Sequence, residues 1–246
     1  MRVTIITAVL NNVSYIQECM NSVSRQGHKD LEHIIVDGGS KDGTQAVVET
    51  HKTYHTRFVS ESDLGVYDAL NKGMSMATGD FIGVLGADDL LADDMVISYL
   101  AEYVETYHCD AVYGNLDFVS RNDRRKIVRK WRSNQYRRDS LEKGWMPPHP
   151  TFYVKKSMLT GVVYSQGFGS CGDYDFLLRI LYQNQIKALF VDKLIVCMRD
   201  GGMSNGSVSN RIGALINDYR ILVHHRIPNP LWVVFMKKVV KLKQFC

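Results

Sequence analysis

Apolar and polar positions in the first part of the chain follow two alternating periods. Residues 3–10 form an apolar run rich in β-branched side chains, which is typical of a strand buried on both faces. Val13, Ile16, Met20 and Val23 then recur at helical spacing. The same alternation predicts further strands at 32–36, 57–60 and 81–85, and further helices at 44–54, 66–77 and 96–107.

Strands that alternate with helices imply right-handed crossovers and a mainly parallel, Rossmann-like central sheet flanked by helices, an α/β fold. Such sheets bind ligands in the crevice beyond the carboxyl ends of their strands. Acidic residues follow three of these ends, namely Asp37, Asp63 and the pair Asp88-Asp89. We therefore expect one crevice to hold all four carboxylates.

The second part of the chain is less regular. Its predicted elements are a hairpin at 110–119 and 126–131, a helix at 173–183, short strands at 188–191 and 194–198, and a helix at 207–225. A tail at 231–245 then mixes large apolar residues with lysines, which is typical of a helix lying in a membrane interface. Its members are Trp232, Phe235, Val239, Leu242, Lys237, Lys238, Lys241 and Lys243.

Composition narrows the class of protein. The 246 residues suffice for one large α/β domain with a small appendage, and 45% hydrophobic and 23% charged residues are ordinary for a soluble globular protein. No apolar run reaches the length of a membrane-spanning helix, and the apolar start lacks a signal-peptide cleavage site. The five cysteines show no CxxC pair, which favours a reducing compartment. We expect a cytoplasmic protein.

The formal net charge of +4 is unevenly distributed, because basic residues concentrate at 121–138 and in the tail. That asymmetry suggests an anionic partner, such as a diphosphate or an acidic membrane surface. Mixed basic and aromatic residues also occur in nucleic-acid-binding proteins, but no nucleic-acid-binding module is present, so we expect no nucleic acid. The alternative, which explains the basic residues at 121–138 about as well as an anionic partner does, is that they form a solvated face of the hairpin.

The Asp88-Asp89 pair has the chemistry of a site for a hard divalent cation. Carboxylates at a strand end can bind Mg²⁺ or Mn²⁺, which keep several waters and share the phosphate oxygens of a substrate. The alternative is that both residues only favour the positive end of the following helix.

Two other polar groups can contact a nucleotide. Asp37 opens a glycine-rich turn and can accept hydrogen bonds from a base or a ribose, although the turn lacks the GxGxxG and P-loop spacings. Asp68, Asn71 and Lys72 lie at helical spacing and can face one ligand, here the donor. The alternatives are an ordinary tight turn and a solvated helix face.

Three blocks together resemble the nucleotide-binding half of glycosyltransferase family 2 enzymes, which have the GT-A fold. They read IIVDGGSKDGT, ESDLGVYDALNKGMSMATGD and FIGVLGADD, and the resemblance is close over residues 3–90 and looser to about 205. It implies that Asp37 contacts the nucleobase, that Asp63 lies against the nucleoside, and that Asp88 holds a metal on the donor diphosphate with Asp89 as helper. Glycine, Gly86, occupies the first acidic position of that metal motif.

The resemblance extends to further residues. It implies donor contacts from Thr7 and from Arg199, which precedes a glycine turn that can fold over the diphosphate. In the block GDYDFLLR, Asp173 matches the general base that deprotonates the acceptor hydroxyl. We expect its neighbour Asp175 and His149, in a proline-rich loop, to line the acceptor site.

The expected enzyme is therefore an inverting glycosyltransferase that uses Mn²⁺ or Mg²⁺ and a nucleoside-diphosphate sugar, with UDP-sugars favoured. The expected acceptor is a hydroxyl of a polyprenyl-diphosphate-linked glycan in bacterial O-antigen, capsule or exopolysaccharide assembly, at the inner face of the plasma membrane. We expect a GT-A domain at 1–205, divided into a donor half (1–90) and an acceptor half (91–205), and a helical extension at 206–246. The alternatives are a sugar-1-phosphate nucleotidyltransferase and a binding protein on a decayed transferase scaffold.

Overall fold

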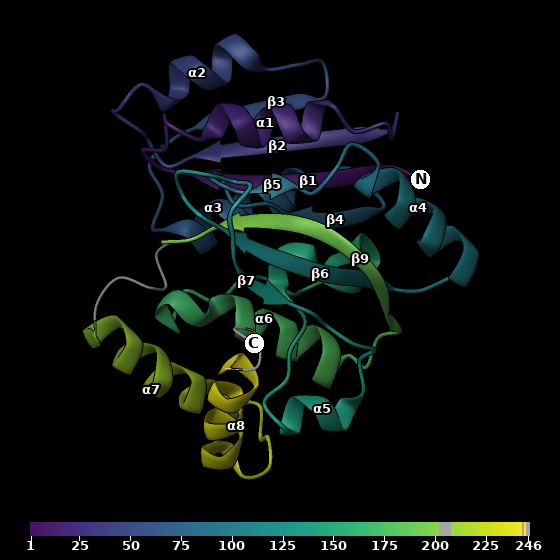
Figure 1. The fold of residues 1–246 in the computed structure, drawn as a ribbon, viewed down its shortest axis with the longest axis vertical. Coiled ribbons are helices and arrows are strands. Elements are labelled where there is room, and N and C mark those ends of the chain that lie inside the picture. The colour runs from purple at the N-terminus through teal and green to yellow at the C-terminus, as the bar shows by residue number, and fades with distance from the viewer. Residues whose placement is uncertain (202–207, 243, 245–246) are drawn as a thin grey trace.

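The computed structural model describes residues 1–201, 208–242 and 244, with the backbone alone at 208–211. The first part of the chain follows the predicted alternation closely, and Figure 1 shows its elements in order. They are β1 (Val3–Val9), α1 (Ile16–Ser24), β2 (Leu31–Asp37), α2 (Thr44–His51), β3 (Thr56–Ser60), α3 (Val66–Met76) and β4 (Phe81–Val84).

The second part of the chain contains the predicted elements together with short ones. They are β5 (Leu90–Leu91), α4 (Val96–Tyr107), β6 (Ala111–Val119), β7 (Ile127–Trp131), α5 (Arg138–Glu142), β8 (Tyr153–Lys155), α6 (Gly172–Leu178) with a π-helical turn (Arg179–Gln183), β9 (Ala188–Arg199), α7 (Val208–His224) and α8 (Pro230–Leu242).

The nine strands among the described residues form one sheet in the order β3-β2-β1-β4-β8-β6-β9-β5, with β7 paired to the second half of β6. The strands β3, β2, β1 and β4 are parallel, so their carboxyl ends meet at one edge, as the sequence predicts. The remaining pairs are mixed, since β8 runs antiparallel to both neighbours whereas β6 and β9 are parallel.

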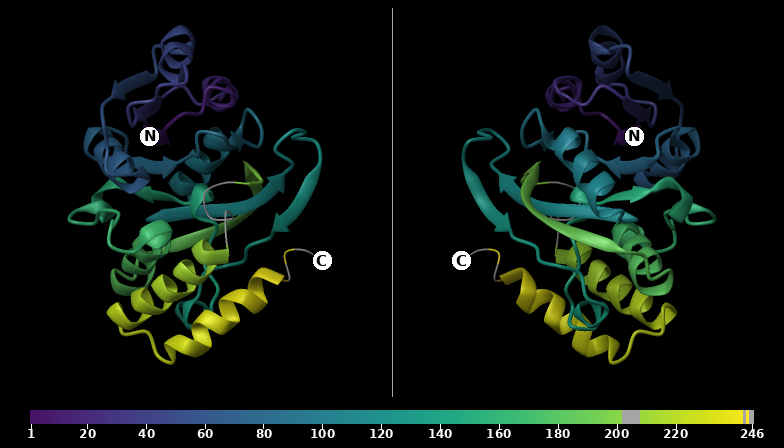
Figure 2. Two further views of the ribbon diagram at one scale, coloured as in Figure 1. Left: turned by 90° about the vertical axis from the view of Figure 1, so that its left-hand side faces the viewer. Right: turned by 90° about the vertical axis from the view of Figure 1, so that its right-hand side faces the viewer.

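Apolar side chains pack against both faces of this sheet. On one face, Ile5 belongs to a core that α1 and α4 complete. On the other, Ile6 belongs to a core that includes α3 and α6 and extends to Ile221 of α7 and Val233 of α8. Adjacent strand residues thus serve opposite cores, as the pleat of a strand requires. The helices α7 and α8 lie at the end of the molecule opposite β3 and α2 (Figures 1 and 2).

One prediction for the sheet was wrong. The strands expected at 188–191 and 194–198 are a single strand, β9, whose register against β6 shifts near Gly114. The exposed pair Asp192-Lys193 indicates a turn from sequence, but it lies on an irregular part of a continuous strand. The backbones approach so closely there that a Cβ on Gly114 would lie 2.6 Å from Ile195 Cγ1.

The domain boundary expected near 205 falls outside the described residues, as do Lys243 and Phe245 of the tail. Over the part of the chain that is described, no helix combines the length and apolar character needed to cross a membrane.

Candidate active site

The loops that follow β2 and β3 interlock at the carboxyl edge of the sheet. The Asp37 side chain is fully buried and turns back into its own loop. Its Oδ2 accepts hydrogen bonds from Ser40 N at 3.0 Å and from Ser60 Oγ at 2.6 Å, and its Oδ1 accepts one from Ser40 Oγ. Asp37 therefore holds the two loops together, and the nucleobase contact that the resemblance implies stays a prediction.

Asp63 lies directly against the Asp37 loop. A Cβ on Gly38 would come within 2.5 Å of Asp63 Oδ2, so a larger residue there would require this carboxylate to move. Its Oδ1 accepts a hydrogen bond from Gly65 N at 2.9 Å, at the start of α3. The structure thus brings Asp37 and Asp63 together, with Asp63 the more accessible of the two.

The three polar residues predicted on α3 all bind protein groups. Asn71 exchanges two hydrogen bonds with the Tyr164 backbone, at 2.7 and 2.9 Å. Lys72 Nζ pairs with Glu61 at 2.9 Å and with Asp68 at 3.3 Å. These contacts fix the loop before α3 and the segment after β8, and the expected donor contacts stay predictions.

Thr7 is also fully buried, and its hydroxyl lies 3.0 Å from His33 Nε2. Its side chain points into the core beneath the carboxyl edge and lines neither of the two large cavities described below.

Asp88 and Asp89 follow β4 in a tight turn and face different surroundings. Asp89 is almost fully buried, and its Oδ1 accepts a hydrogen bond from the Arg199 backbone N–H at 3.0 Å. Burial and the charge of Asp88 raise the pKa of Asp89 to about 7. A Cβ on Gly86 would lie 2.4 Å from Asp89 Oδ2, so any larger residue at the first position of the metal motif would require the Asp89 carboxylate to move.

Two arginines surround Asp88. The Arg121 guanidinium, from the turn between β6 and β7, lies 3.3 Å from Asp88 Oδ2. The buried Arg199 donates to the Asp88 carbonyl and to Glu18 Oε2, the latter at 2.8 Å. Both guanidinium groups stack on the Tyr15 ring, at 4.7 and 4.6 Å.

The protein ligands near Asp88 suffice for a divalent cation only if a bound substrate supplies the remaining ligands. Within the described residues, no group of three His, Cys, Asp or Glu side chains forms a metal cage. Mg²⁺ and Mn²⁺ are commonly held by one or two carboxylates together with waters and substrate phosphates. Asp88 can supply one such carboxylate, so the residues fit a cation held mainly by a bound diphosphate.

A cavity of about 440 Å³ opens between the sheet, α6 and α8. Asp89, Asp173, His149 and Arg199 line it together with Tyr67. The residues that border the metal motif and the predicted general base therefore share one cavity. We expected Asp37, Asp63, Asp88 and Asp89 to line one crevice, but of these four only Asp89 lines this cavity. Asp37 turns inward, and Asp88 turns toward Arg121.

Aromatic rings surround Asp173 and His149 in this cavity. Asp173 N–H donates to the Tyr67 hydroxyl at 3.3 Å, and the Tyr67 ring stacks on Tyr164. His149 Nε2 lies 2.8 Å from the Tyr164 hydroxyl, and the ring meets Phe176 edge-on. Burial lowers the pKa of His149, against the opposing effect of the Asp173 charge, so the imidazole is mainly neutral at pH 7.

Asp175 does not lie where we expected it. Its buried carboxylate pairs with Arg179 and with His225 Nε2, the latter at 2.8 Å, and it is absent from the cavity lining. Residues two apart on a helix point in nearly opposite directions, so Asp173 and Asp175 cannot face one ligand. Asp175 instead joins α6 to the end of α7.

The structure adds residues that the sequence did not single out. Tyr67 is the tyrosine of the YDALNKG segment in the second sequence block, so that segment is the sequence signal that could have identified it. Lys237, Lys238 and Lys241 were expected to face a membrane, yet all three line the cavity. Arg121 lies in the basic stretch, but nothing in the sequence connects it with Asp88.

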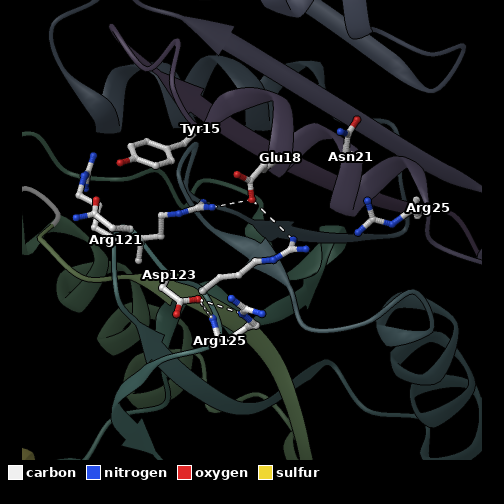
Figure 3. A pocket seen from close by; sticks show the side chains of 10 residues that line it. Tyr15, Glu18, Asn21, Arg25, Arg121, Asp123 and Arg125 are labelled. Atoms are coloured by element: carbon white, nitrogen blue, oxygen red, sulfur yellow. Dashed lines mark hydrogen bonds and ion pairs between the residues drawn. The ribbon is translucent and has the colours of Figure 1, made fainter.

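A second cavity of about 790 Å³ lies between α1 and the turn that joins β6 to β7 (Figure 3). Arg121 and Arg125 approach it from the hairpin turn, Glu18 approaches it from α1, and Arg25 from the residue that follows α1. Arg199 lines both cavities.

Comparison with known families decides what this arrangement belongs to. Residues 4–164 match the model described as "Glycosyl transferase family 2". The chain belongs to glycosyltransferase family 2. The transferase is 27% identical over 208 residues to a "PGL/p-HBAD biosynthesis glycosyltransferase" of Mycobacterium bovis, a match that covers 82% of this chain and 78% of that protein. It is also 27% identical over 180 residues to an Escherichia coli chondroitin synthase, covering 72% of this chain and 26% of that longer protein.

Solved structures show the same fold. S. aureus TarS (residues 1–349) in complex with UDP-GlcNAc has a TM-score of 0.75 at 18% identity, covering 98% of the transferase and 70% of TarS. The mannosyltransferase PcManGT from Pyrobaculum calidifontis, in complex with GDP-Man and Mn²⁺, has a TM-score of 0.67 at 18% identity, covering 97% and 69%. The transferase therefore has the GT-A fold, as its three sequence blocks imply.

Proposed function

We propose that this glycosyltransferase inverts the anomeric centre by a single displacement, with Asp173 as the general base. The observation that carries this proposal is that Asp173 and the Asp89 turn line one cavity. Asp173 Oδ1 accepts a hydrogen bond from Tyr174 N–H at 2.8 Å, which orients the carboxylate and leaves Oδ2 for the acceptor proton. The acceptor oxygen then attacks the anomeric carbon from the face opposite the nucleoside diphosphate, which leaves with the bonding electrons.

The donor is proposed to lie along the carboxyl edge from Asp63 to Asp88. A divalent cation bound there would supply charge stabilisation to the departing diphosphate. Arg199 keeps the Asp88 turn in place through its carbonyl and carries positive charge at the wall of the cavity. The complexes of TarS with UDP-GlcNAc and of PcManGT with GDP-Man and Mn²⁺ support a nucleoside-diphosphate sugar and Mn²⁺ as first choices.

The acceptor is proposed to be a lipid-linked glycan, with a polyprenyl diphosphate as carrier, in bacterial surface-polysaccharide assembly at the inner face of the plasma membrane. The cavity supports an amphiphilic acceptor, because rings such as Tyr67 and Trp131 share it with Lys237, Lys238 and Lys241. Aromatic faces suit sugar rings and apolar chains, and lysines suit a diphosphate.

The test is a donor panel of UDP-sugars and GDP-mannose with Mn²⁺ or Mg²⁺, read out by released nucleoside diphosphate and by product on a lipid-linked acceptor. Asp173→Asn should abolish transfer and leave donor binding unchanged. Asp30→Asn is a matched control, because Asp30 is exposed and precedes the amino end of β2. Full transfer by Asp173→Asn would refute the base assignment, and release of inorganic diphosphate from a nucleoside triphosphate would favour a nucleotidyltransferase instead.

A further inference from the structure

Large apolar side chains are exposed along α7 and α8. Ile212, Ile216, Tyr219 and Val223 of α7 are spaced by four, three and four residues, so they share one helix face. Leu231, Trp232, Phe235 and Leu242 of α8 are also exposed. We call these eight side chains the α7–α8 surface, and each of them is 39% to 73% exposed.

The opposite sides of the same helices are buried. Ile221 and Leu222 of α7, Ile227 of the turn and Val233 of α8 belong to the core that contains α6. The helices are thus fixed to the domain while the α7–α8 surface stays uncovered, at the end of the molecule farthest from β3 (Figure 2). Large apolar side chains exposed along two helices that contact each other indicate an interaction site.

The charges around this surface select its partner. From residue 206 onward the sequence contains seven Lys and Arg residues and one acidic residue, Asp218. Asp218 is buried and pairs with Lys237 at 2.6 Å, so it contributes no exposed negative charge. Arg220, Arg226 and Lys238 are exposed near the apolar residues. Two copies of this surface would repel each other, whereas an anionic bilayer offers both acyl chains and negative charge.

We propose that the α7–α8 surface docks the enzyme on an anionic lipid bilayer, with the apolar side chains at the headgroup boundary. Neither helix is long and apolar enough to span a membrane, so the two helices lie on it. The side of α8 that faces the domain lines the cavity through Lys237 and Val240. Docking therefore places a wall of the acceptor cavity next to the bilayer, and this last step alone rests on the proposed lipid-linked acceptor.

The test is sedimentation of the full-length protein with vesicles of phosphatidylcholine alone or of phosphatidylcholine mixed with phosphatidylglycerol, without donor or acceptor. We expect binding to the anionic vesicles that weakens as salt is added. The double variant Trp232→Gln/Phe235→Gln should lose about tenfold or more in vesicle affinity, because it removes two large membrane-inserting groups. Tyr54→Gln/Tyr107→Gln is the matched control, since both tyrosines are exposed but lie outside α7 and α8.

Equal binding by the two double variants would overturn the proposal, as would a dimer in sedimentation velocity that Trp232→Gln/Phe235→Gln dissociates. Turnover on a detergent-dispersed acceptor separates this proposal from the proposed function. Vesicle binding without turnover would support docking and count against the acceptor assignment, whereas turnover without vesicle binding would overturn docking alone.

Discussion

The ion pair between Arg121 and Asp88 leads to a prediction about metal binding. Arg121 brings a positive charge to the carboxylate that we expect to bind the divalent cation. A cation that binds Asp88 in the donor-free protein must first displace this guanidinium. Arg121→Gln should therefore bind Mn²⁺ more tightly than the unmodified protein does.

The expected gain in Mn²⁺ affinity follows from the distance between the Arg121 and Asp88 charges and from the exposure of the two side chains. Charges 3.3 Å apart attract by about 1.3 kcal/mol in water and by about 5 kcal/mol at an effective dielectric constant of about 20. The Arg121 and Asp88 side chains are 40% and 23% exposed, and exposed pairs contribute only about 0.2–1 kcal/mol in practice. We take about 1 kcal/mol, which corresponds to roughly a fivefold gain in Mn²⁺ affinity.

The assay is a titration of donor-free protein with Mn²⁺, in which electron paramagnetic resonance reports the free ion. Removing any positive charge nearby also favours cation binding, so the control must lose the same charge elsewhere. Arg125→Gln serves this purpose, because Arg125 is highly exposed and pairs with Asp123 on the same turn. If Arg121→Gln binds Mn²⁺ no more tightly than Arg125→Gln does, Arg121 does not compete for the metal ligand.

Three further predictions concern stability. Asp37→Ala removes the acceptor of two donors of the buried Ser40 and should lower the free energy of unfolding by about 2–5 kcal/mol in urea denaturation; a loss below about 1 kcal/mol would contradict the contacts described. Burial lowers the pKa of His33 to about 4, so the unfolded chain binds the extra proton first, and stability should fall by up to about 3 kcal/mol as the pH drops from about 6.5 to 4. His33→Gln should flatten that slope in denaturation curves measured at each pH. Gly73→Ala should lower the melting temperature, because its Cβ would lie 2.4 Å from Ile6 Cγ2, and overpacking by about 1–3 kcal/mol exceeds the helix-propensity gain of about 1 kcal/mol.

The parallel half of the fold was predictable because its signals were strong. Strands such as β1 and β2 are buried on both faces, so their apolar runs were unmistakable, and the helices between them keep a clear period. The strands β5 and β8 contain two and three residues, which is too short for any periodic signal. In β9, local polarity at Asp192-Lys193 suggested a break that pairing with β6 overrides.

The site was predictable only in part, since sequence motifs identify residues but not the direction of their side chains. Asp173 and Asp89 line one cavity, whereas Asp37 turns inward to bind its own loop. Asp175 was misassigned although helical geometry alone separates it from Asp173. The contact between Arg121 and Asp88 joins residues 33 positions apart, and such long-range pairs have no local signature.

The close fit of α8 over Gly144 has a consequence for engineering. Gly144 has a positive φ of 76°, and a Cβ there would lie 2.4 Å from Lys237 N, so the helix rests directly on this backbone. One wall of the proposed acceptor cavity is thus a single helix that rests on a glycine. Grafting the corresponding helix from a relative should retune acceptor choice while preserving sugar-donor choice, provided that the glycine seat is retained.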